Sequence, residues 1–231
     1  MNLLALDTSS EGCSAALWAN GQLTDRFSLA PRGHTRLLMP MVRELLAEQG
    51  LAPSELDTLA FACGPGSFTG LRIATGVVQG LAFGLDIPVV PVSSLAAVAQ
   101  QVIDVSAPAE GTGVAVAFDA RMDEVYWGCF QVQGGWAIPL GSEQVRAPEA
   151  VGLPEGPEHW LGAGSGWRFH DRMPAPVTRA VPAPDTAPVP RAREVAVLGQ
   201  QAWQRGEWVP AAQARPVYLR DQVTWQKLPG R

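Results

Sequence analysis

Apolar and polar positions over the first thirty residues predict three consecutive β-strands. Apolar runs separated by short polar breaks occur at 3–6, 13–19 and 23–29. The second break contains the pair Asn20-Gly21, and such a pair between two apolar runs is a strong signal for a β-hairpin. The first run leads directly into Asp7, so the opening unit has a carboxylate at the end of its first strand.

Helical and extended patterns alternate over the next seventy residues. The spacing of the apolar residues predicts helices at 35–49, 68–85 and 93–102 and buried strands at 57–63 and 89–92. Thr35 is a candidate N-cap for the first helix, and Ser93 or Ser94 for the third. Pro40 lies inside the first helical pattern, so that helix either begins late or is kinked there.

The second half of the chain repeats the order of the first. An apolar strand again ends in an aspartate, Asp119, and a hairpin with a Gly134-Gly135 turn follows it. The patterns then predict a strand at 160–163, an extended proline-rich linker at 174–190 and a helix at 191–205.

Each half of the chain thus opens with an apolar strand that ends in an aspartate and is followed by a hairpin. Two such units predict an α/β protein of two ribonuclease H-like domains in an actin-like arrangement. We place the first domain at residues 1–105 and the second, degenerate one at residues 106–231. The tail after residue 210 is not assigned to either domain.

The helix predicted at 68–85 is apolar on two opposite faces. At 100° per residue, one face gathers the expected core stripe, Leu71, Ala74, Val78, Leu81, Ala82 and Leu85. The other face gathers Ile73, Gly76, Val77, Gly80 and Gly84. Each glycine costs about 1 kcal/mol relative to alanine inside a helix, so three on one stripe favour the close approach of another helix.

The helix predicted at 35–49 has a similarly broad apolar arc, which leaves two readings of the pair. Either the two helices cover each other within one domain, or they form an intersubunit bundle, which is the reading that we prefer. The predicted interface comprises His34, Leu38, Val42, Leu45, Ile73, Gly76, Val77, Gly80 and Gly84.

Composition and charge narrow the possible partners. The net charge is −5, 16 of the 17 basic residues are arginine, and no basic run occurs, so we expect no direct nucleic-acid binding by this chain alone. No apolar stretch approaches the roughly 20 residues of a membrane span, and we expect no membrane association. Three widely spaced cysteines in apolar sequence indicate reduced thiols and a cytoplasmic protein.

A glycine-rich turn at 64–67 precedes the second helix and gives the sequence a candidate anion site. With the strand-end aspartates it would form a degenerate nucleotide site of Asp7, Ser9, Gly64, Gly66, Ser67 and Asp119. The glycines of 162–166 resemble an adenosine loop. However, Glu11 would repel a phosphate. The single lysine of the chain is Lys227, so no lysine lies near this candidate site in the sequence.

Several motifs together resemble the TsaB family of bacterial tRNA threonylcarbamoyladenosine biosynthesis proteins, formerly grouped with glycoproteases. They are Leu-Asp-Thr-Ser-Ser at 6–10, Gly-Pro-Gly-Ser-Phe-Thr-Gly-Leu-Arg-Ile at 64–73, Pro-Val-Ser-Ser-Leu at 91–95, Asp-Ala-Arg at 119–121 and Glu-Val-Tyr at 124–126. The set spans residues 1 to about 130. A shorter match, Pro-Val-Tyr-Leu-Arg, lies at 216–220.

The resemblance implies an actin-like fold and a role as obligate partner of the paralogue TsaD. TsaD holds the metal and transfers a threonylcarbamoyl group from its adenylate to the adenosine beside the tRNA anticodon, and the ATPase TsaE joins the pair. Helices of the N-terminal domain form the dimer in this family, and we expect a homodimer when the chain is alone. No cofactor of its own is expected, whereas ATP or ADP at the interface of the complex stays open.

Two enzymatic alternatives stand against this expectation. A metal-dependent, glycoprotease-like peptidase needs converging metal ligands, yet His34, His159 and His170 are isolated in the sequence. An actin-fold ATPase acting alone needs a phosphate turn, where this chain has Thr8-Ser9-Ser10-Glu11. We therefore expect neither a catalytic site nor a bound metal.

Overall fold

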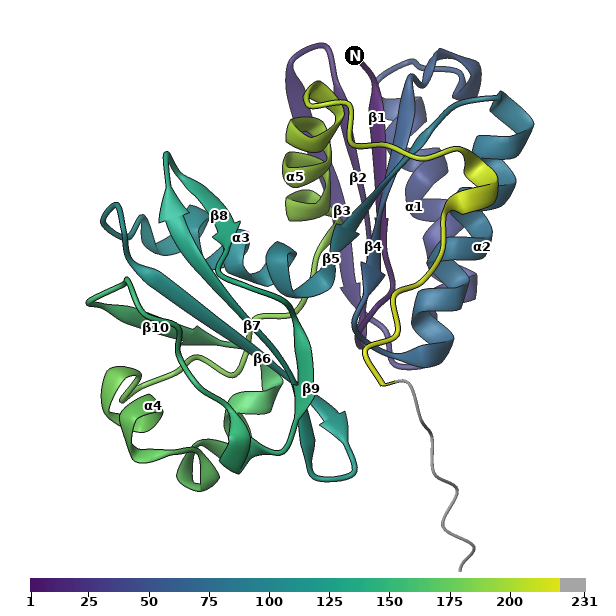
Figure 1. The fold of residues 1–231 in the computed structure, drawn as a ribbon. Coiled ribbons are helices and arrows are strands. Elements are labelled where there is room, and N and C mark those ends of the chain that lie inside the picture. The colour runs from purple at the N-terminus through teal and green to yellow at the C-terminus, as the bar shows by residue number, and fades with distance from the viewer. Residues whose placement is uncertain (221–231) are drawn as a thin grey trace, which may run out of the picture.

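Two five-stranded sheets organise residues 1–220, the part of the chain that the computed structural model describes (Figure 1). In the first sheet the strand order is β3-β2-β1-β4-β5. These strands are β1 (Leu3–Asp7), β2 (Gly12–Ala19), β3 (Gln22–Leu29), β4 (Thr58–Gly64) and β5 (Val89–Ser93). The first three are antiparallel, and β4 and β5 are added parallel to β1.

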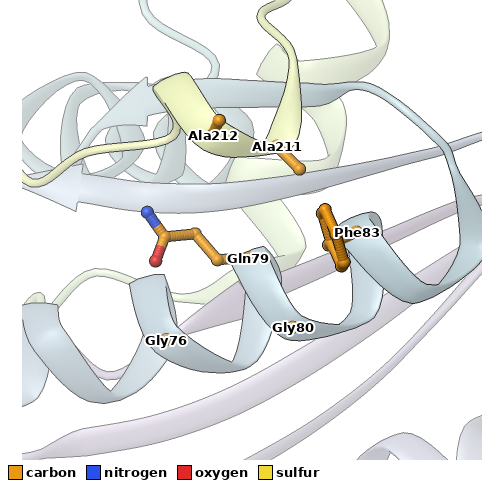
Figure 2. Close-up of a pocket in the computed structure, with 6 residues that line it drawn as sticks. All are labelled: Gly76, Gln79, Gly80, Phe83, Ala211 and Ala212. Atoms are coloured by element: carbon orange, nitrogen blue, oxygen red, sulfur yellow. The ribbon is translucent and has the colours of Figure 1, made fainter.

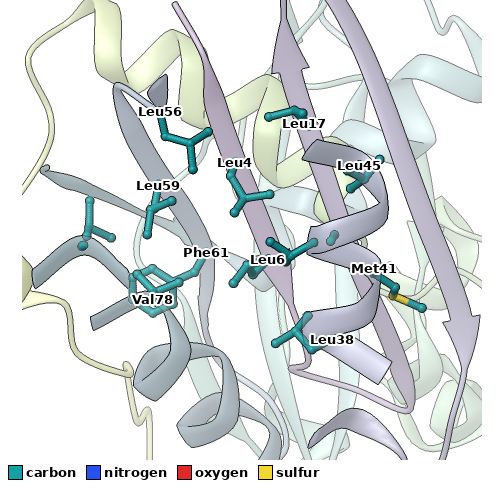
Figure 3. Packing of buried hydrophobic residues seen from close by; sticks show 14 of the residues in the cluster. Leu4, Leu6, Leu17, Leu38, Met41, Leu45, Leu56, Leu59, Phe61 and Val78 are labelled. Atoms are coloured by element: carbon teal, nitrogen blue, oxygen red, sulfur yellow. The ribbon is translucent and has the colours of Figure 1, made fainter. Parts of the chain in front are cut away.

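Helices cover both faces of the first sheet. On one face lie α1 (His34–Glu48) and α2 (Phe68–Leu85), and α5 (Ala192–Gln204) packs on the other against β1, β2 and β4. Because successive side chains of a strand point to opposite faces, Leu4 and Leu6 meet the α1 and α2 side (Figure 3), while Leu3 and Ala5 meet α5.

The second sheet repeats the opening of the first. Its strands run in the order β10-β6-β7-β8, with β9 also paired to β7. They are β6 (Gly113–Arg121), β7 (Glu124–Gln133), β8 (Trp136–Pro139), β9 (Gln144–Arg146) and β10 (Trp160–Ala163). In this sheet β6 takes the place of β1. It pairs antiparallel with the strand that follows it, β7, and parallel with a later strand, β10, as β1 does with β2 and β4.

Helix α3 (Ser94–Ser106) connects the two sheets. It packs on β6, β7 and β8 of the second sheet and also contacts α5 and β4 of the first. The remaining pieces of the second unit are α4 (Ala175–Ala180) and 3-10 helices at Pro148–Ala150 and Ser165–Arg172. Two further 3-10 helices, at Pro53–Glu55 and Ala211–Gln213, belong to the first unit, and the second of these, η4, contacts α2.

Most predicted elements are confirmed, and α2 has the predicted bounds. Ser93 caps α3, because its Oγ accepts from the amides of Leu95 and Ala96, both at 3.1 Å. The predicted N-cap of α1 was wrong, because Gly33 and not Thr35 lies there, and the helix runs through Pro40, which excludes a late start. The predicted helix at 93–102 extends to Ser106 as α3. The prediction missed β9 and the short helix α4, which lies within the stretch predicted as an extended linker.

The assignment of residues 106–231 to one second domain needs correction for α5, whereas the tail after residue 210 was left open. The α5 residues Ala192, Val195 and Ala196 fill the core on one face of the first sheet. The tail also returns to this sheet, where Val209 pairs with Val89 and Ala214 is buried. Residues 221–231 lie outside the described part of the chain.

Helix α2 is apolar and long enough, by length and composition alone, to cross a membrane, which the sequence analysis did not expect. Its packing explains the composition differently. One face is buried against β4 and β1, and only a third of its residues are buried in the chain. Its apolar character thus comes from a core face and from a second, outward face that residues 1–220 leave uncovered.

Candidate functional site

The Asp7 carboxyl group is fully buried at the end of β1. Its Oδ1 accepts from the amide of Ser9 at 2.9 Å, while its Oδ2 has no hydrogen-bond partner within residues 1–220. Burial raises the pKa of Asp7 to about 7, against a smaller opposing effect of the Ser9 hydrogen bonds. Burial therefore favours the neutral form of this carboxyl group.

The turn before α2 is packed tightly against the end of β1. The Ser67 amide donates to the carbonyl of Ser9 at 2.7 Å. A Cβ on Gly66 would lie 2.3 Å from that carbonyl oxygen, and a Cβ on Gly70 would lie 1.9 Å from the Thr8 carbonyl oxygen. These glycines are therefore required by close backbone packing. The Ser67 amide, which lies in the candidate anion site, is already bonded to the chain's own carbonyl.

Asp119 lies in the second sheet and is held by arginines. Its Oδ2 is 3.0 Å from Arg168 Nη1, and its Oδ1 accepts from the amide of Arg121 at 2.8 Å. The structure therefore gathers five of the six predicted nucleotide-site residues, Asp7, Ser9, Gly64, Gly66 and Ser67, at one end of the first sheet. Asp119 serves a separate ion-pair cluster.

The glycine-rich loop at 162–166 is also explained by packing. Trp167 is buried beneath it and donates from Nε1 to the Ala115 carbonyl at 3.0 Å. A Cβ on Gly162 would lie 2.5 Å from Val181, and one on Gly166 would lie 2.8 Å from the backbone of Ala117. These close approaches explain why the loop contains glycines. The glycines therefore need no adenosine-binding role to account for them.

The α1 members of the predicted interface lie in the core, which corrects the prediction. Leu38, Val42 and Leu45 are buried against the first sheet (Figure 3), and His34 is buried with Nε2 3.0 Å from the Ser10 carbonyl. Helix α1 uses this apolar arc to pack on β2 and β3. Its side chains at these positions are not available to a partner.

The outward face of α2 remains open, as its glycine stripe indicated. At Gly76, Gly80 and Gly84 an added Cβ would meet no atom within 4 Å. Ile73 and Val77 are half-buried at the edge of the core. The fold of this chain therefore gives no reason for the three glycines.

A shallow groove of about 390 Å³ runs along this face between α2 and η4 (Figure 2). Its lining residues are Gly76, Gln79, Gly80, Phe83, Ala211 and Ala212. The Phe83 side chain is 83% exposed at its rim. An exposed phenylalanine thus lies beside a hollow lined by two glycines of α2 and two alanines of η4.

Sequence reasoning missed Phe83 and the η4 wall. Phe83 follows Gly80 by three positions on the same helix, so the helical phasing that found the glycine stripe contained the signal. Ala211 and Ala212 could not be found in this way, because the tail reaches α2 only through the tertiary fold.

Comparisons with known proteins agree on one family. The family model described as TsaD: tRNA N6-adenosine threonylcarbamoyltransferase matches residues 28–179. The whole chain is 39% identical to 98% of the tRNA threonylcarbamoyladenosine biosynthesis protein TsaB of Haemophilus influenzae. It is also 37% identical, over the full length of both proteins, to TsaB of Escherichia coli strain K12.

Two solved structures from Pseudomonas aeruginosa share the fold. One is described as an uncharacterized protein with similarity to peptidase YEAZ, with a TM-score of 0.89 at 49% identity over 95% of this chain and 99% of that one. The other, YeaZ, has a TM-score of 0.88 at 50% identity over 94% of this chain and 99% of that one.

Proposed function

The chain belongs to the TsaB family of tRNA threonylcarbamoyladenosine biosynthesis proteins, and from this premise we propose that it is the non-catalytic partner of a TsaD-type transferase. In the proposed complex, the transferase moves a threonylcarbamoyl group from threonylcarbamoyl-AMP to N6 of the adenosine beside the tRNA anticodon. This chain supplies the surface that holds the transferase in its active state.

The open glycine stripe of α2 is the observation that carries the proposal. Three glycines cost helix stability, about 1 kcal/mol each, and no atom of the described residues, 1–220, lies within 4 Å of where their Cβ atoms would be. A partner helix that approaches closely along Gly76, Gly80 and Gly84 would recover this cost through backbone contacts. Phe83 and the groove beside it offer such a helix one apolar anchor and one pocket.

The contacts of the strand-end aspartates support a non-catalytic role. Asp7 is fully buried and accepts from the Ser9 amide, and Asp119 forms an ion pair with Arg168. Within residues 1–220, no group of three or more His, Cys, Asp or Glu side chains is placed to hold a metal ion. The peptidase alternative requires such a metal-binding group, and the ATPase alternative requires strand-end aspartates that are free to act.

Further partners follow from the same proposal. A TsaE-type ATPase would join the pair, and ATP or ADP would bind, if at all, at an interface of the complex. The net charge of −5 makes tRNA contact by this chain alone unfavourable, so tRNA would be held through the transferase. The proposed complex acts in the cytoplasm.

Gly80→Leu tests the docking surface. We expect it to weaken binding to the purified TsaD-type protein about 100-fold in calorimetric titration, because a bulky side chain in a close helix contact costs about 3 kcal/mol. The melting temperature of the isolated chain should not fall, since leucine is a better helix former than glycine and its side chain projects into open space.

Gly152→Leu is the matched control. Gly152 is exposed in the second unit, and a Cβ there would also meet nothing within 4 Å. The control should bind and should support threonylcarbamoyl transfer to tRNA like the original chain. Unchanged binding by Gly80→Leu would exclude α2 as the docking surface. If the transferase modifies tRNA at the same rate with and without this chain, the partner role is excluded.

A further inference from the structure

The tail from residue 209 to residue 220, which we call the strap, is fixed to the first unit at several points. The strap begins where Val209 pairs with Val89 of β5. Gln79 of α2 then donates from Nε2 to the Ala214 carbonyl at 2.6 Å, and the Val217 amide donates to the Cys63 carbonyl at 2.7 Å. These bonds hold the strap across α2 and the end of β4 (Figure 1).

Side chains near the start of α2 add a fourth attachment. The Tyr218 ring lies 5.5 Å from the Phe68 ring between centroids, and Arg72 donates from Nε to the Tyr218 hydroxyl at 3.3 Å. The Arg72 guanidinium also lies over the Phe68 ring, 3.8 Å from its centroid. This cluster fixes the direction in which the strap leaves the first unit.

The last described residue of the strap reaches the second unit. Arg220 forms an ion pair with Glu124 of β7, and its Nη2 donates to the Arg121 carbonyl at 3.4 Å. The Arg220 side chain is only 19% exposed, so the pair is more than a loose surface contact. Arg220 thereby contacts both sides of the tight turn between β6 and β7.

The turn that Arg220 contacts is unusual. Arg121, Met122 and Asp123 all have positive φ angles, of 63°, 55° and 58°. Non-glycine residues rarely adopt this conformation, and a run of them persists only where surrounding contacts hold it. The ion pair with Arg220 and the Arg121 amide bond to Asp119 are two such contacts.

We propose that the strap mechanically couples the outward face of α2 to the β6–β7 turn of the second unit through the Arg220–Glu124 ion pair. The strap residues Ala211 and Ala212 form one wall of the α2 groove, and Gln79 contributes to its floor. The attachments at Ala214, Val217, Tyr218 and Arg220 are only a few residues apart, so there is little slack in the strap and a shift of this wall is passed along it to Arg220. By reciprocity, the state of the turn changes the free energy of occupying the groove.

Hydrogen exchange of backbone amides in the full chain tests this coupling. Gln79→Met keeps the side-chain size and removes the donor to Ala214. We expect it to raise exchange about fivefold at the Val217 amide and also at the amides of 121–125, the change that losing an attachment of about 1 kcal/mol produces in an opening equilibrium. Faster exchange at Val217 with an unchanged turn would overturn the coupling.

Variants at the other end separate the ion pair from the rest of the strap. Arg220→Gln should raise exchange at 121–125, and the charge exchange Arg220→Glu with Glu124→Arg should restore it. Arg215→Gln is the matched control, because Arg215 is exposed in the same strap and forms no ion pair within residues 1–220; it should change nothing at the turn. An unchanged turn in Arg220→Gln, or equal effects of Arg220→Gln and Arg215→Gln, would overturn the proposal.

Discussion

At the scale of single residues, Asp7 and Glu194 are two carboxyl groups that burial holds at a pKa of about 7, compared with ordinary values of 3.8 and 4.5. Each has one carboxyl oxygen without a hydrogen-bond partner within residues 1–220. The folded chain therefore binds protons more tightly than the unfolded chain between about pH 4 and pH 7. Below the ordinary pKa values these groups make their largest contribution to the free energy of unfolding. This contribution is lost as pH rises from the ordinary pKa through the folded pKa of about 7.

Asp7→Asn and Glu194→Gln should each flatten this pH dependence. We expect a small gain in stability against urea at pH 5, where only the unfolded carboxyl group is ionised, and a larger gain at pH 8, where the folded original chain also carries the buried charge. Unfolding curves at pH 5, 6, 7 and 8 measure the slope. Equal slopes for the variants and the original chain would show that neither group titrates in this range.

Glycines of the same helix should respond in opposite ways to alanine. Gly70→Ala should destabilise the chain by about 3 kcal/mol, because the new Cβ would press on the Thr8 carbonyl oxygen. Gly76→Ala should stabilise it by about 1 kcal/mol, since that face is open and alanine is the better helix former. Chemical denaturation of the two variants measures both effects, and a shared sign would contradict the packing described for α2.

Residue roles were predictable where they depend on nearby sequence. Helical phasing alone separated the glycine stripe from the core face of α2, and a strand ending in Asp7 was visible in the first seven residues. The reason for Gly70 was hidden, because it depends on Thr8, which is 62 positions earlier in the chain. Phasing also cannot say which apolar arc a sheet will cover, which is why Leu38, Val42 and Leu45 were wrongly assigned to an interface.

At the scale of elements, α2 combines a buried face with a face that would be uncovered in a monomer. We predict that the chain alone self-associates at high concentration through this outward face. Phe83→Glu should shift the population toward monomer in sedimentation equilibrium, because it places a charge on the rim of the groove. The melting temperature should stay close to that of the original chain, as Phe83 makes few contacts at 83% exposure.

Val105→Glu is the control for this prediction. Val105 is also 83% exposed but lies near the end of α3, so the same charge there should leave self-association unchanged. If both variants dissociate equally, general charge repulsion and not the α2 face sets the association.

Elements with strong periodicity or a clear cap were predicted well, and short ones were not. The strands of the first sheet and the helix α2 carry long apolar patterns. The three residues of β9 and the six of α4 are too short to show a period, and α4 lies in a proline-rich stretch. These two elements form because the second sheet and the Trp167 cluster provide surfaces to pack on.

At the scale of the whole molecule, the predicted pair of ribonuclease H-like units in an actin-like arrangement is confirmed by the structure and its relatives. The two strand-Asp openings made this duplication visible. The return of α5 and the strap to the first sheet was not predictable, because a helix pattern at 192–204 shows which face is apolar but not which of two sheets it covers.

This return decides whether the predicted first domain, residues 1–105, can fold by itself. One face of its sheet, including Leu3, Ala60 and Val90, is covered by α5. A fragment of residues 1–106 would expose this apolar face to water, at a cost of about 25 cal/mol for each Å². We expect it to aggregate or to lack a cooperative thermal transition when expressed alone, while co-expression with a fragment of residues 107–231 yields a soluble one-to-one complex. Circular dichroism melting and light scattering distinguish these results, and a cooperative, monomeric 1–106 fragment would show that the sheet does not depend on α5.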